Sequence, residues 1–285
     1  MSGAPLVIVG PTGAGKTAAA LRIAERHGVD IVSMDAMQVY RGMDVGTAKA
    51  TPHERARVRH HCVDVRDPTE PFDAVDFAAE VERVGTRTVL CGGTVFYLRA
   101  WMQPLVDLPP VDPEVRARCE AVVDPHAALV AVDPVLAARL HPNDRVRVIR
   151  GLEVHAQTGR RLSELHDADL GHRKACTVVW LDRDDLDDIL DARVDAMMRA
   201  GYLDEVGALL DAGVPRTCKP MLSLGYKHLA DHLAGEIDLA EAVLRTKVAT
   251  RQFARRQRKF LRNLGFTPTS DGPHVNAAAA GAFGA

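Results

Sequence analysis

The chain has 285 residues, enough for one large α/β domain or for one domain that carries an insertion. Its formal net charge of −2 and pI of about 6.6 exclude a uniformly basic protein that coats nucleic acid, although they allow one basic face. The 5 cysteines show no C-x-x-C pair and no zinc-type spacing, and an odd number is typical of a reducing compartment. Because no signal-peptide pattern or membrane-length apolar run is present, we expect a cytoplasmic protein that does not bind a membrane.

Residues 5–17 have the pattern of a buried strand, a glycine-rich loop and the start of a helix. Gly10, Gly15, Lys16 and Thr17 fit G-x-x-x-x-G-K-[ST], a loop whose backbone N–H groups wrap a polyphosphate at a helix N-terminus. In such a loop Lys16 neutralises phosphate charge, and Thr17 offers its hydroxyl to a phosphate or to Mg²⁺. A glycine-rich turn without a ligand is the weaker alternative, because the match is complete and stands between strand and helix patterns. The motif leaves open which phosphate compound binds, and whether a phosphate is transferred or leaves.

Asp35 directly follows a second apolar strand, predicted at Asp30–Met34. Open α/β sheets bind ligands in the crevice beyond the carboxyl ends of their parallel strands, so Asp35 is predicted to face the phosphate site. A helix cap or a turn residue is the ordinary alternative for an aspartate at a strand end. The polar connection that follows, with Gln38, Tyr40 and Gly46–Lys49, favours a functional loop.

The strand predicted at Thr88–Cys91 ends in Gly92, Gly93 and Thr94. P-loop ATPase or GTPase motors would end such a strand in an aspartate that holds Mg²⁺. Two glycines instead let another group approach the backbone closely, and Thr94 offers a hydroxyl at the rim. This strand end therefore argues against a motor protein.

A proline-rich segment at residues 104–113 interrupts the alternation of strands and helices, and residues 114 to about 165 have a helical pattern without a buried strand. Arginines outnumber acidic residues in this helical part, and taken alone they indicate solvated helix faces. The low-complexity C-terminal end indicates disorder. We predict a core of residues 1–110 and 166–268, a helical insertion of residues 111–165 that contacts a partner, and a disordered tail of residues 269–285.

A core strand is predicted again at Cys176–Leu181, followed by a helix at Asp184–Ala200. The acidic residues at the start of this helix complement the helix dipole and need no functional explanation. Arg193, further along, is either an ion-pair partner of Asp188 or Asp191, or a group that reaches the phosphate site.

The segment Arg245–Arg262 is rich in lysine and arginine, contains Phe253 and Phe260, and has no acidic residue. Nothing inside the segment can therefore form helix-stabilising ion pairs with these cations. A polyanionic partner is the economical explanation.

A polyphosphate loop, an adjacent aspartate, a helical insertion and a basic C-terminal helix together suit a transferase that modifies nucleic acid. The chain resembles the bacterial tRNA dimethylallyltransferases, P-loop enzymes that prenylate the exocyclic amine of the adenosine 3′ of the anticodon. The resemblance extends from residue 5 to about residue 265, and it is carried, in the order of the family, by Gly10–Thr17, Asp35–Tyr40 with Gly46–Lys49, His60 and His61 with Asp67 and Pro68, Gly92–Thr94, Asp112–Arg116, His141–Asp144 with Arg150, Gly225–Lys227, Thr250–Gln252 and Arg255–Gln257. It implies an α/β fold with a P-loop NTPase-like parallel sheet flanked by helices and a helical insertion domain.

The resemblance also implies a mechanism and a set of site residues. Dimethylallyl diphosphate would bind with Mg²⁺ as cofactor, and Asp35 would be the catalytic residue that accepts the proton of the adenosine amine. The tRNA would bind through its anticodon stem-loop, and we expect a monomer. The diphosphate-binding residues would be Gly10, Thr12, Gly13, Ala14, Gly15, Lys16, Thr17 and Arg193, with Thr17 also the possible metal ligand. The residues that match tRNA-binding positions are Asp35, Met37, Gln38, Thr94, Arg116, Arg147, Arg150, Gly225, Tyr226, Lys227, Arg255, Arg256 and Gln257.

Three other functions are weighed against this one. An adenylate isopentenyltransferase would prenylate a free nucleotide, but it needs neither the insertion nor the basic segment. A small-molecule P-loop kinase would bind ATP in the loop and use Asp35 to activate a hydroxyl. A non-catalytic tRNA-binding protein with a relic P-loop would not depend on Asp35. The chain departs from the family at Ala36, where Ser is usual, at Gly207, at Phe260 and in a short stretch near Val122–Val132.

Overall fold

The computed structural model describes residues 4–103, 106, 108–167, 174–269 and 272–284. The chain divides into two compact units, a core unit of Met1–Met102 with Lys174–Ala285 and an inserted unit of Gln103–Arg173. The inserted unit contains the stretch 111–165 in which we predicted a helical insertion, together with the whole proline-rich segment of residues 104–113. Residues 104, 105 and 107 of that segment lie outside the described residues.

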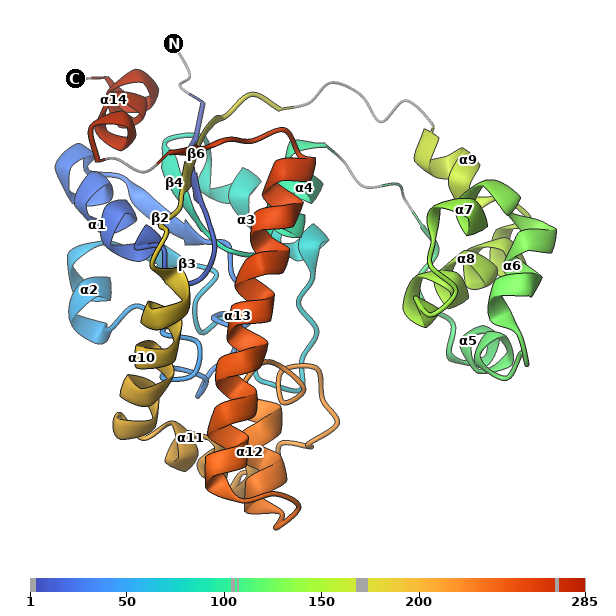
Figure 1. Cartoon of the computed structure of the whole chain (residues 1–285). Coiled ribbons are helices and arrows are strands. Elements are labelled where there is room, and N and C mark those ends of the chain that lie inside the picture. The colour runs from blue at the N-terminus through green and yellow to red at the C-terminus, as the bar shows by residue number, and fades with distance from the viewer. Residues whose placement is uncertain (1–3, 104–105, 107, 168–173, 270–271, 285) are drawn as a thin grey trace. The chain divides into compact units, whose positions relative to one another are not determined.

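Six parallel strands form the sheet of the core unit in the order β3-β2-β4-β1-β5-β6 (Figure 1). Their bounds are Leu6–Val9 (β1), Asp30–Ser33 (β2), His60–His61 (β3), Thr88–Gly92 (β4), Thr177–Leu181 (β5) and Pro268–Thr269 (β6). In the middle of the sheet, Ile8 of β1 lies opposite Cys91 of β4 on one side and Val179 of β5 on the other. β1 is buried along its whole length, as a parallel strand covered on both faces should be. The predicted α/β class with a P-loop NTPase-like sheet is confirmed.

Helices cover both faces of this sheet because alternate strand residues point to opposite sides. Leu6 and Ile8 share a buried cluster with α1 and α14, whereas Val7 and Val9 share another with α3, α4, α11 and α12. The bounds of the helices in the core unit are Lys16–His27 (α1), Pro52–Arg57 (α2), Ala74–Val84 (α3), Val95–Met102 (α4), Leu186–Arg199 (α10), Tyr202–Asp211 (α11), Tyr226–Leu233 (α12), Leu239–Asn263 (α13) and Gly272–Phe283 (α14). The 25-residue helix α13 runs past α10 and α12 (Figure 1). None of the helices in the described part of the chain is both long enough and apolar enough to cross a bilayer.

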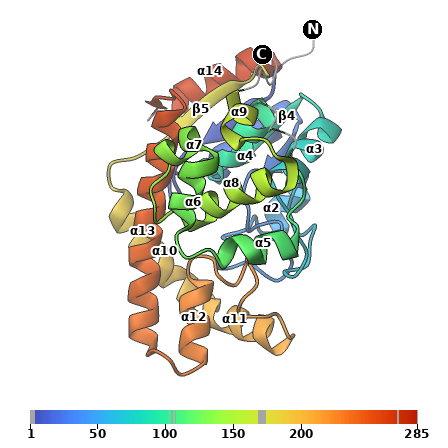
Figure 2. The same ribbon diagram turned by 90° about the vertical axis from the view of Figure 1, so that its right-hand side faces the viewer.

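The inserted unit consists of short helices that pack around α8 (Figure 2). Their bounds are Pro113–Glu120 (α5), Pro125–Val132 (α6), Pro134–Arg139 (α7), Arg145–Thr158 (α8) and Leu162–Asp167 (α9). Aspartates at 112, 124, 133 and 144 accept hydrogen bonds from backbone N–H groups in the first turns of α5 to α8, and proline follows three of them. Leu129, Val148 and Ile149 lie in the buried core of this unit. The sequence therefore specifies where these short helices begin.

Two arginines that match tRNA-binding positions have structural partners inside the inserted unit. Arg116 of α5 and Arg150 of α8 lie 3.1 and 3.2 Å from the carboxylate of Glu153, whose side chain is 1% exposed. Arg150 also donates a hydrogen bond of 2.7 Å to the carbonyl of Pro109. Arg147 is different, because its side chain is 72% exposed and Asp144, at 3.3 Å, is its one ion-pair partner among the residues that the structure describes. Contact of these arginines with RNA stays a prediction, and Arg147 is the most accessible of the three.

The prediction of a disordered C-terminal tail over residues 269–285 is wrong for most of that segment. β6 includes Thr269, and Gly272–Phe283 forms helix α14, in which Val275 and Ala279 are buried against α1 and the sheet. The ring of Phe283 lies 5.5 Å from that of His27. Low complexity was misleading here because alanine has the highest helix propensity, and a small side chain lets α14 approach its neighbours closely. Residues 270, 271 and 285 lie outside the described residues.

The docking of α14 can be tested with one substitution at two positions. Ala279 is 1% exposed, so Ala279→Asp places an unpaired carboxylate in an apolar contact and should lower the free energy of unfolding by at least about 2 kcal/mol. Ala277 is exposed on the same helix, and Ala277→Asp should cost less than about 1 kcal/mol, mostly through helix propensity. Urea unfolding of both variants measures the difference, and equal losses would contradict a docked α14.

Candidate active site

The glycine-rich loop lies at the carboxyl end of β1 and leads into α1. Gly10 has to be glycine, because a Cβ there would lie 2.1 Å from the carbonyl oxygen of Leu181 in β5. Gly15 is the N-cap of α1 with a left-handed φ of 81°, and no side chain caps the helix. The first-turn N–H groups of α1 have no partner within the helix, so they form an anion site together with the helix dipole.

Lys16 turns back over this loop, where its Nζ donates a hydrogen bond of 2.7 Å to the carbonyl of Pro11. Burial lowers the pKa of Lys16 to about 8, the nearby positive charge of Arg193 acts in the same direction, and Asp35 opposes both. The lysine is therefore charged near neutral pH but loses its proton more easily than an exposed lysine would. An anion in the loop would restore its affinity for the proton.

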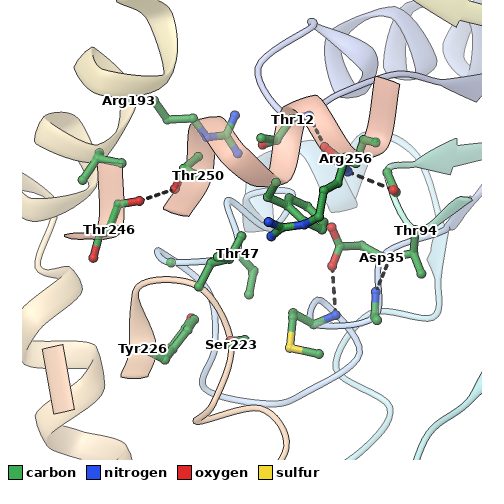
Figure 3. A pocket seen from close by; sticks show the side chains of 18 of the residues that line it. Thr12, Asp35, Thr47, Thr94, Arg193, Ser223, Tyr226, Thr246, Thr250 and Arg256 are labelled. Carbon is green, nitrogen blue, oxygen red and sulfur yellow. Dashed lines mark hydrogen bonds between the residues drawn. The ribbon is translucent and has the colours of Figure 1, made fainter. Parts of the chain in front are cut away.

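Asp35 stands two residues beyond β2 with its two carboxylate oxygens in different surroundings (Figure 3). Oδ1 accepts hydrogen bonds from the backbone N–H of Met37 at 2.8 Å and of Gln38 at 3.4 Å. Oδ2 has no hydrogen bond to any residue that the structure describes. The N–H of Ala36 donates to Oγ1 of Thr94 at 3.0 Å, which ties this turn to the end of β4. The aspartate is thus a turn residue, as the alternative interpretation had it, and it also presents a free oxygen to the cavities described next.

Two cavities meet at Asp35. The phosphate cavity encloses about 470 Å³ and is lined by the glycine-rich loop, Lys16, Thr17 and Gln38. The apolar cavity encloses about 570 Å³, and its walls include Met197, Leu222 and Phe260. The residues that line both cavities are Thr12, Asp35, Thr47, Gly93, Arg193, Phe253 and Gln257. A ligand with an anionic head and an apolar tail could therefore occupy both, with its junction at Asp35.

Arg193 of α10 lines both cavities, and Figure 3 shows its side chain at the wall of one of them. This position favours the second of the two roles predicted for it, contact with a bound phosphate, which stays a prediction. Among the described residues Arg193 forms no ion pair with Asp188 or Asp191, and Asp191 instead pairs with Arg251 of α13. Burial lowers the pKa of Arg193, and the charge of Asp35 opposes this shift. A partly buried guanidinium at the wall of the phosphate cavity is a ready partner for an anion.

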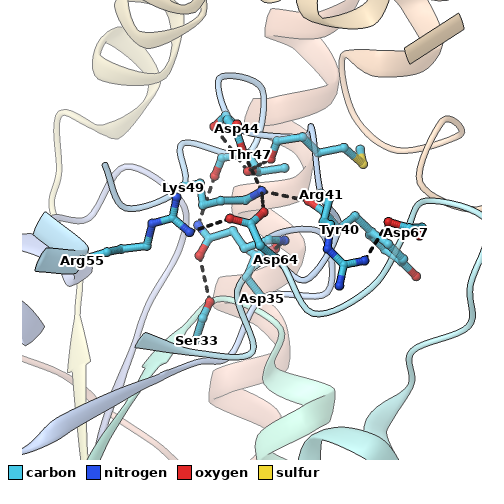
Figure 4. A network of polar contacts seen from close by, with 12 residues as sticks. Ser33, Asp35, Tyr40, Arg41, Asp44, Thr47, Lys49, Arg55, Asp64 and Asp67 are labelled. Carbon is cyan, nitrogen blue, oxygen red and sulfur yellow. Dashed lines mark hydrogen bonds and ion pairs between the residues drawn. The ribbon is translucent and has the colours of Figure 1, made fainter. Parts of the chain in front are cut away.

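The loop between β2 and α2 is held by a buried lysine (Figure 4). Nζ of Lys49 donates to the carbonyl of Tyr40 at 2.8 Å and forms ion pairs with Asp44 at 2.5 Å and Asp64 at 2.6 Å. Gln38 is fixed within the same loop, since its Oε1 accepts from Ser33 at 2.8 Å and its Nε2 donates to a backbone carbonyl. The segment Gly46–Lys49 thus stabilises the loop that forms one wall of the site, and Lys49 does so from inside the protein.

Glu205 of α11 is a residue that sequence reasoning missed. Its carboxylate accepts three backbone N–H groups, those of Asp44 at 2.7 Å, Val45 at 2.6 Å and Gly46 at 3.0 Å, and the hydroxyl of Tyr226 at 2.6 Å. Consecutive N–H groups that converge in this way form an anion-binding concavity, here filled by an internal carboxylate. No signal near Glu205 in the sequence announces this role, because its three backbone partners lie about 160 residues away.

The residues that match tRNA-binding positions are distributed unevenly around the site. The apolar cavity is lined by Met37, Thr94, Tyr226, Arg256 and Gln257. Lys227, which follows Tyr226 in the sequence, is exposed. Tyr226 and Gly225 are buried, and Gln257 is hydrogen-bonded within the protein. These three residues are therefore less accessible to RNA than an exposed side chain would be.

Most cations of the basic helix α13 have acidic partners, although the segment Arg245–Arg262 itself contains no acidic residue. The prediction looked only inside the segment, whereas most partners come from the acidic face of α10 and from Asp182 before it. These pairs are Lys247 with Asp195 at 2.7 Å, Arg251 with Asp191, Arg255 with Asp187 at 2.7 Å and Arg258 with Asp182 at 2.7 Å. Arg245 pairs with Glu241, one turn earlier on α13, at 2.7 Å. The acidic start of α10 therefore does more than complement a helix dipole. Arg256, which lies over the ring of Phe253 at 5.8 Å, has no carboxylate partner among the described residues.

The fold and the site define a P-loop α/β protein in which a phosphate cavity opens onto an apolar cavity beside one carboxylate. The model of the IPP transferase family matches residues 38–264, and the chain belongs to this family. It is 45% identical to a tRNA dimethylallyltransferase of Geobacter metallireducens and 44% identical to one of Sorangium cellulosum, with 90% of this chain and 89% and 87% of those proteins covered.

Solved structures agree with this membership. The full-length tRNA isopentenylpyrophosphate transferase of Bacillus halodurans is similar with a TM-score of 0.67 and 34% identity, over 97% of this chain and 94% of that one. A eukaryotic dimethylallyltransferase acting on tRNA is similar with a TM-score of 0.76 and 28% identity, over 91% of this chain and 70% of that one. The resemblance noted in the sequence is confirmed.

The pKa of Lys16 predicts how anion binding depends on pH. Below a pH of about 8 the lysine is already charged, whereas above it binding must take up a proton, so affinity for inorganic diphosphate should fall as pH rises through about 8. In Lys16→Arg the charge persists over this range, so that part of the pH dependence should disappear. Titration calorimetry between about pH 7 and pH 9 measures both proteins, and identical profiles would contradict the assignment.

Proposed function

We propose that this protein transfers a dimethylallyl group from dimethylallyl diphosphate to N6 of the adenosine that follows the anticodon of a tRNA, with release of diphosphate. The observation that carries the proposal is the junction of a phosphate cavity and an apolar cavity at Asp35 and Arg193. A prenyl diphosphate has an anionic diphosphate group for the phosphate cavity and an apolar prenyl chain for the apolar cavity. The names of the relatives, which are tRNA dimethylallyltransferases, support the same reaction.

The diphosphate would bind to the N–H groups at the start of α1 and to the side chains of Lys16 and Arg193. Negative charge grows on the diphosphate as the bond from its oxygen to the allylic carbon breaks. Two cations and a helix N-terminus fixed in advance around that charge stabilise the transition state more than the ground state. The partly buried setting of both cations strengthens this effect.

Mg²⁺ would bind in the phosphate cavity as it does in other P-loop proteins. There a side-chain hydroxyl of the protein and oxygens of the bound phosphates coordinate the ion. Thr17 is the residue of this chain that would hold it. Among the described residues, no three His, Cys, Asp or Glu side chains are grouped to bind a metal, so the ion would depend on the diphosphate for most of its ligands. When bound, it would neutralise part of the charge on the leaving diphosphate.

Asp35 would accept the proton of the adenosine amine. A new bond forms between N6 and the allylic carbon, the bond from that carbon to the diphosphate oxygen breaks, and the amine proton passes to the carboxylate. The turn around Met37 holds Oδ1, which leaves Oδ2 for this proton. The adenosine has to leave its base stack to reach the junction, and a cavity with aromatic and apolar walls suits an extruded base.

Contacts with tRNA phosphates would come from the cations that the protein leaves available. Arg256 at the rim of the apolar cavity is the best placed of these, whereas Arg255 already pairs with Asp187. In the inserted unit, exposed Arg147 is the corresponding candidate. Phosphate contacts of this kind position the RNA, and the cavity around Asp35 reads the base.

The alternative functions fit the site less well. A small-molecule kinase would place ATP in the loop, but the large apolar share of the cavity wall beyond Asp35, with Met197, Leu222 and Phe260, suits a prenyl chain better than the small polar acceptor of a kinase. An adenylate isopentenyltransferase would share the two cavities, and only the choice of acceptor separates it from the proposal. Membership of a family whose relatives are named for tRNA favours the nucleic acid.

The proposal is tested by incubating the protein with Mg²⁺, dimethylallyl diphosphate and tRNA that has adenosine after the anticodon. Mass spectrometry of the digested tRNA should show one prenylated adenosine. Asp35→Asn should lower the rate by at least about 100-fold while tRNA affinity is kept, because only the proton acceptor is lost. Asp211→Asn, on an exposed residue of α11, is the matched control and should behave like the unmodified protein. Unmodified tRNA in the presence of a bound donor would overturn the proposal.

A further inference from the structure

Gln257 of α13 reaches the glycine-rich loop from a helix far away in the sequence. Its Oε1 accepts a hydrogen bond of 2.9 Å from the backbone N–H of Thr12, and its Nε2 donates one of 2.9 Å to the carbonyl of Gly93. The side chain is only 5% exposed. One carboxamide therefore joins the loop, the end of β4 and α13, and it lies in the wall of both cavities.

The glycine at the end of β4 is explained by this contact. A Cβ at Gly93 would lie 2.2 Å from Nε2 of Gln257, so only glycine leaves room for the carboxamide at this position. The sequence indicated that some group approaches the backbone here, and the group is Gln257. The absence of a side chain at Gly93 therefore permits the hydrogen bond that Gln257 makes there.

The contact also decides which N–H groups are available to an anion. The N–H of Thr12 is committed to Gln257, so a bound phosphate has to use the groups from Gly13 onward. A carboxamide suits this place because it accepts and donates at once, whereas a carboxylate would set an oxygen against the Gly93 carbonyl. The ion pairs between α13 and α10 hold the helix that carries Gln257.

We propose that Gln257 is a positioning residue that fixes the conformation of the phosphate-binding loop and so controls its affinity for diphosphate. It acts through Thr12 and Gly93 and does not touch the reacting atoms. This inference rests on the proposed function only in taking diphosphate as the ligand of the loop. It assigns Gln257 a role different from the contact with tRNA that the family resemblance implies.

The test measures binding of inorganic diphosphate in the presence of Mg²⁺ and without tRNA. Gln257→Leu leaves the partly buried N–H of Thr12 and the buried carbonyl of Gly93 without partners, which frees the loop from α13, and diphosphate should bind about tenfold or more weakly. Gln257→Glu keeps an acceptor for Thr12 but adds negative charge beside the loop, so it should also bind weakly. Gln252→Leu, at an exposed glutamine of the same helix, is the matched control and should bind normally.

A substitution outside Gln257 guards against misfolding as the cause. Gly93→Ala displaces the carboxamide without altering it, and it should weaken diphosphate binding to a similar degree. The double variant Gly93→Ala with Gln257→Leu should be no weaker than the weaker single variant, since both remove one contact. Affinity for an anticodon stem-loop RNA should change by less than about twofold in all of them.

Normal diphosphate affinity in folded Gln257→Leu and Gly93→Ala would overturn the inference. An equal loss of diphosphate and RNA affinity would also overturn it, because a general structural defect would then explain both. Neither result depends on prenyl transfer. A protein that binds diphosphate as expected but never prenylates tRNA would contradict the proposed function and leave the role of Gln257 intact.

Discussion

The parallel pairing of β1 with β4 and of β4 with β2 brings three chain segments to one edge of the sheet. Val9 lies opposite Gly92, and Ser33 lies opposite Cys91, so the chain leaves these strands side by side. The glycine-rich loop, the turn with Asp35 and the Gly93 corner follow directly. Because β1 is buried on both faces, this register cannot slip without exposing the core. The site therefore inherits its geometry from the most buried strand of the protein.

Helices α10 and α13 form another wall of the two cavities, and ion pairs join these helices to each other. Acidic residues at intervals of four on α10 meet basic residues at the same interval on α13, the helical repeat that places side chains on one face. Partly exposed ion pairs of this kind each contribute little free energy, but as a series they fix the rotation and register of the two helices. That rotation turns Arg193 and Gln257 toward the phosphate cavity. The acidic residues of α10 also offset much of the positive charge of α13, in a chain whose net charge is −2.

Local patterns predicted much of this arrangement. The phosphate loop, the strand ends and the carboxylate of Asp35 were predictable because each depends on residues close together in sequence and on the general geometry of parallel sheets. The role of Gln257 was not, since its partner Thr12 is 245 residues away. The same limit hid Glu205 and the partners of the basic helix. The tail was misjudged for another reason: composition alone does not show that alanines at the right interval can be buried.

The account holds that one ligand spans both cavities and passes Asp35 at their junction. The most direct measurement is a crystal structure of the protein with Mg²⁺ and the thiodiphosphate analogue of dimethylallyl diphosphate, whose carbon–sulfur bond resists displacement. We expect its diphosphate group against Gly13–Thr17 and Arg193, and its allyl chain beyond Asp35 in the apolar cavity. A diphosphate bound elsewhere, or an allyl chain that points away from Asp35, would contradict the account.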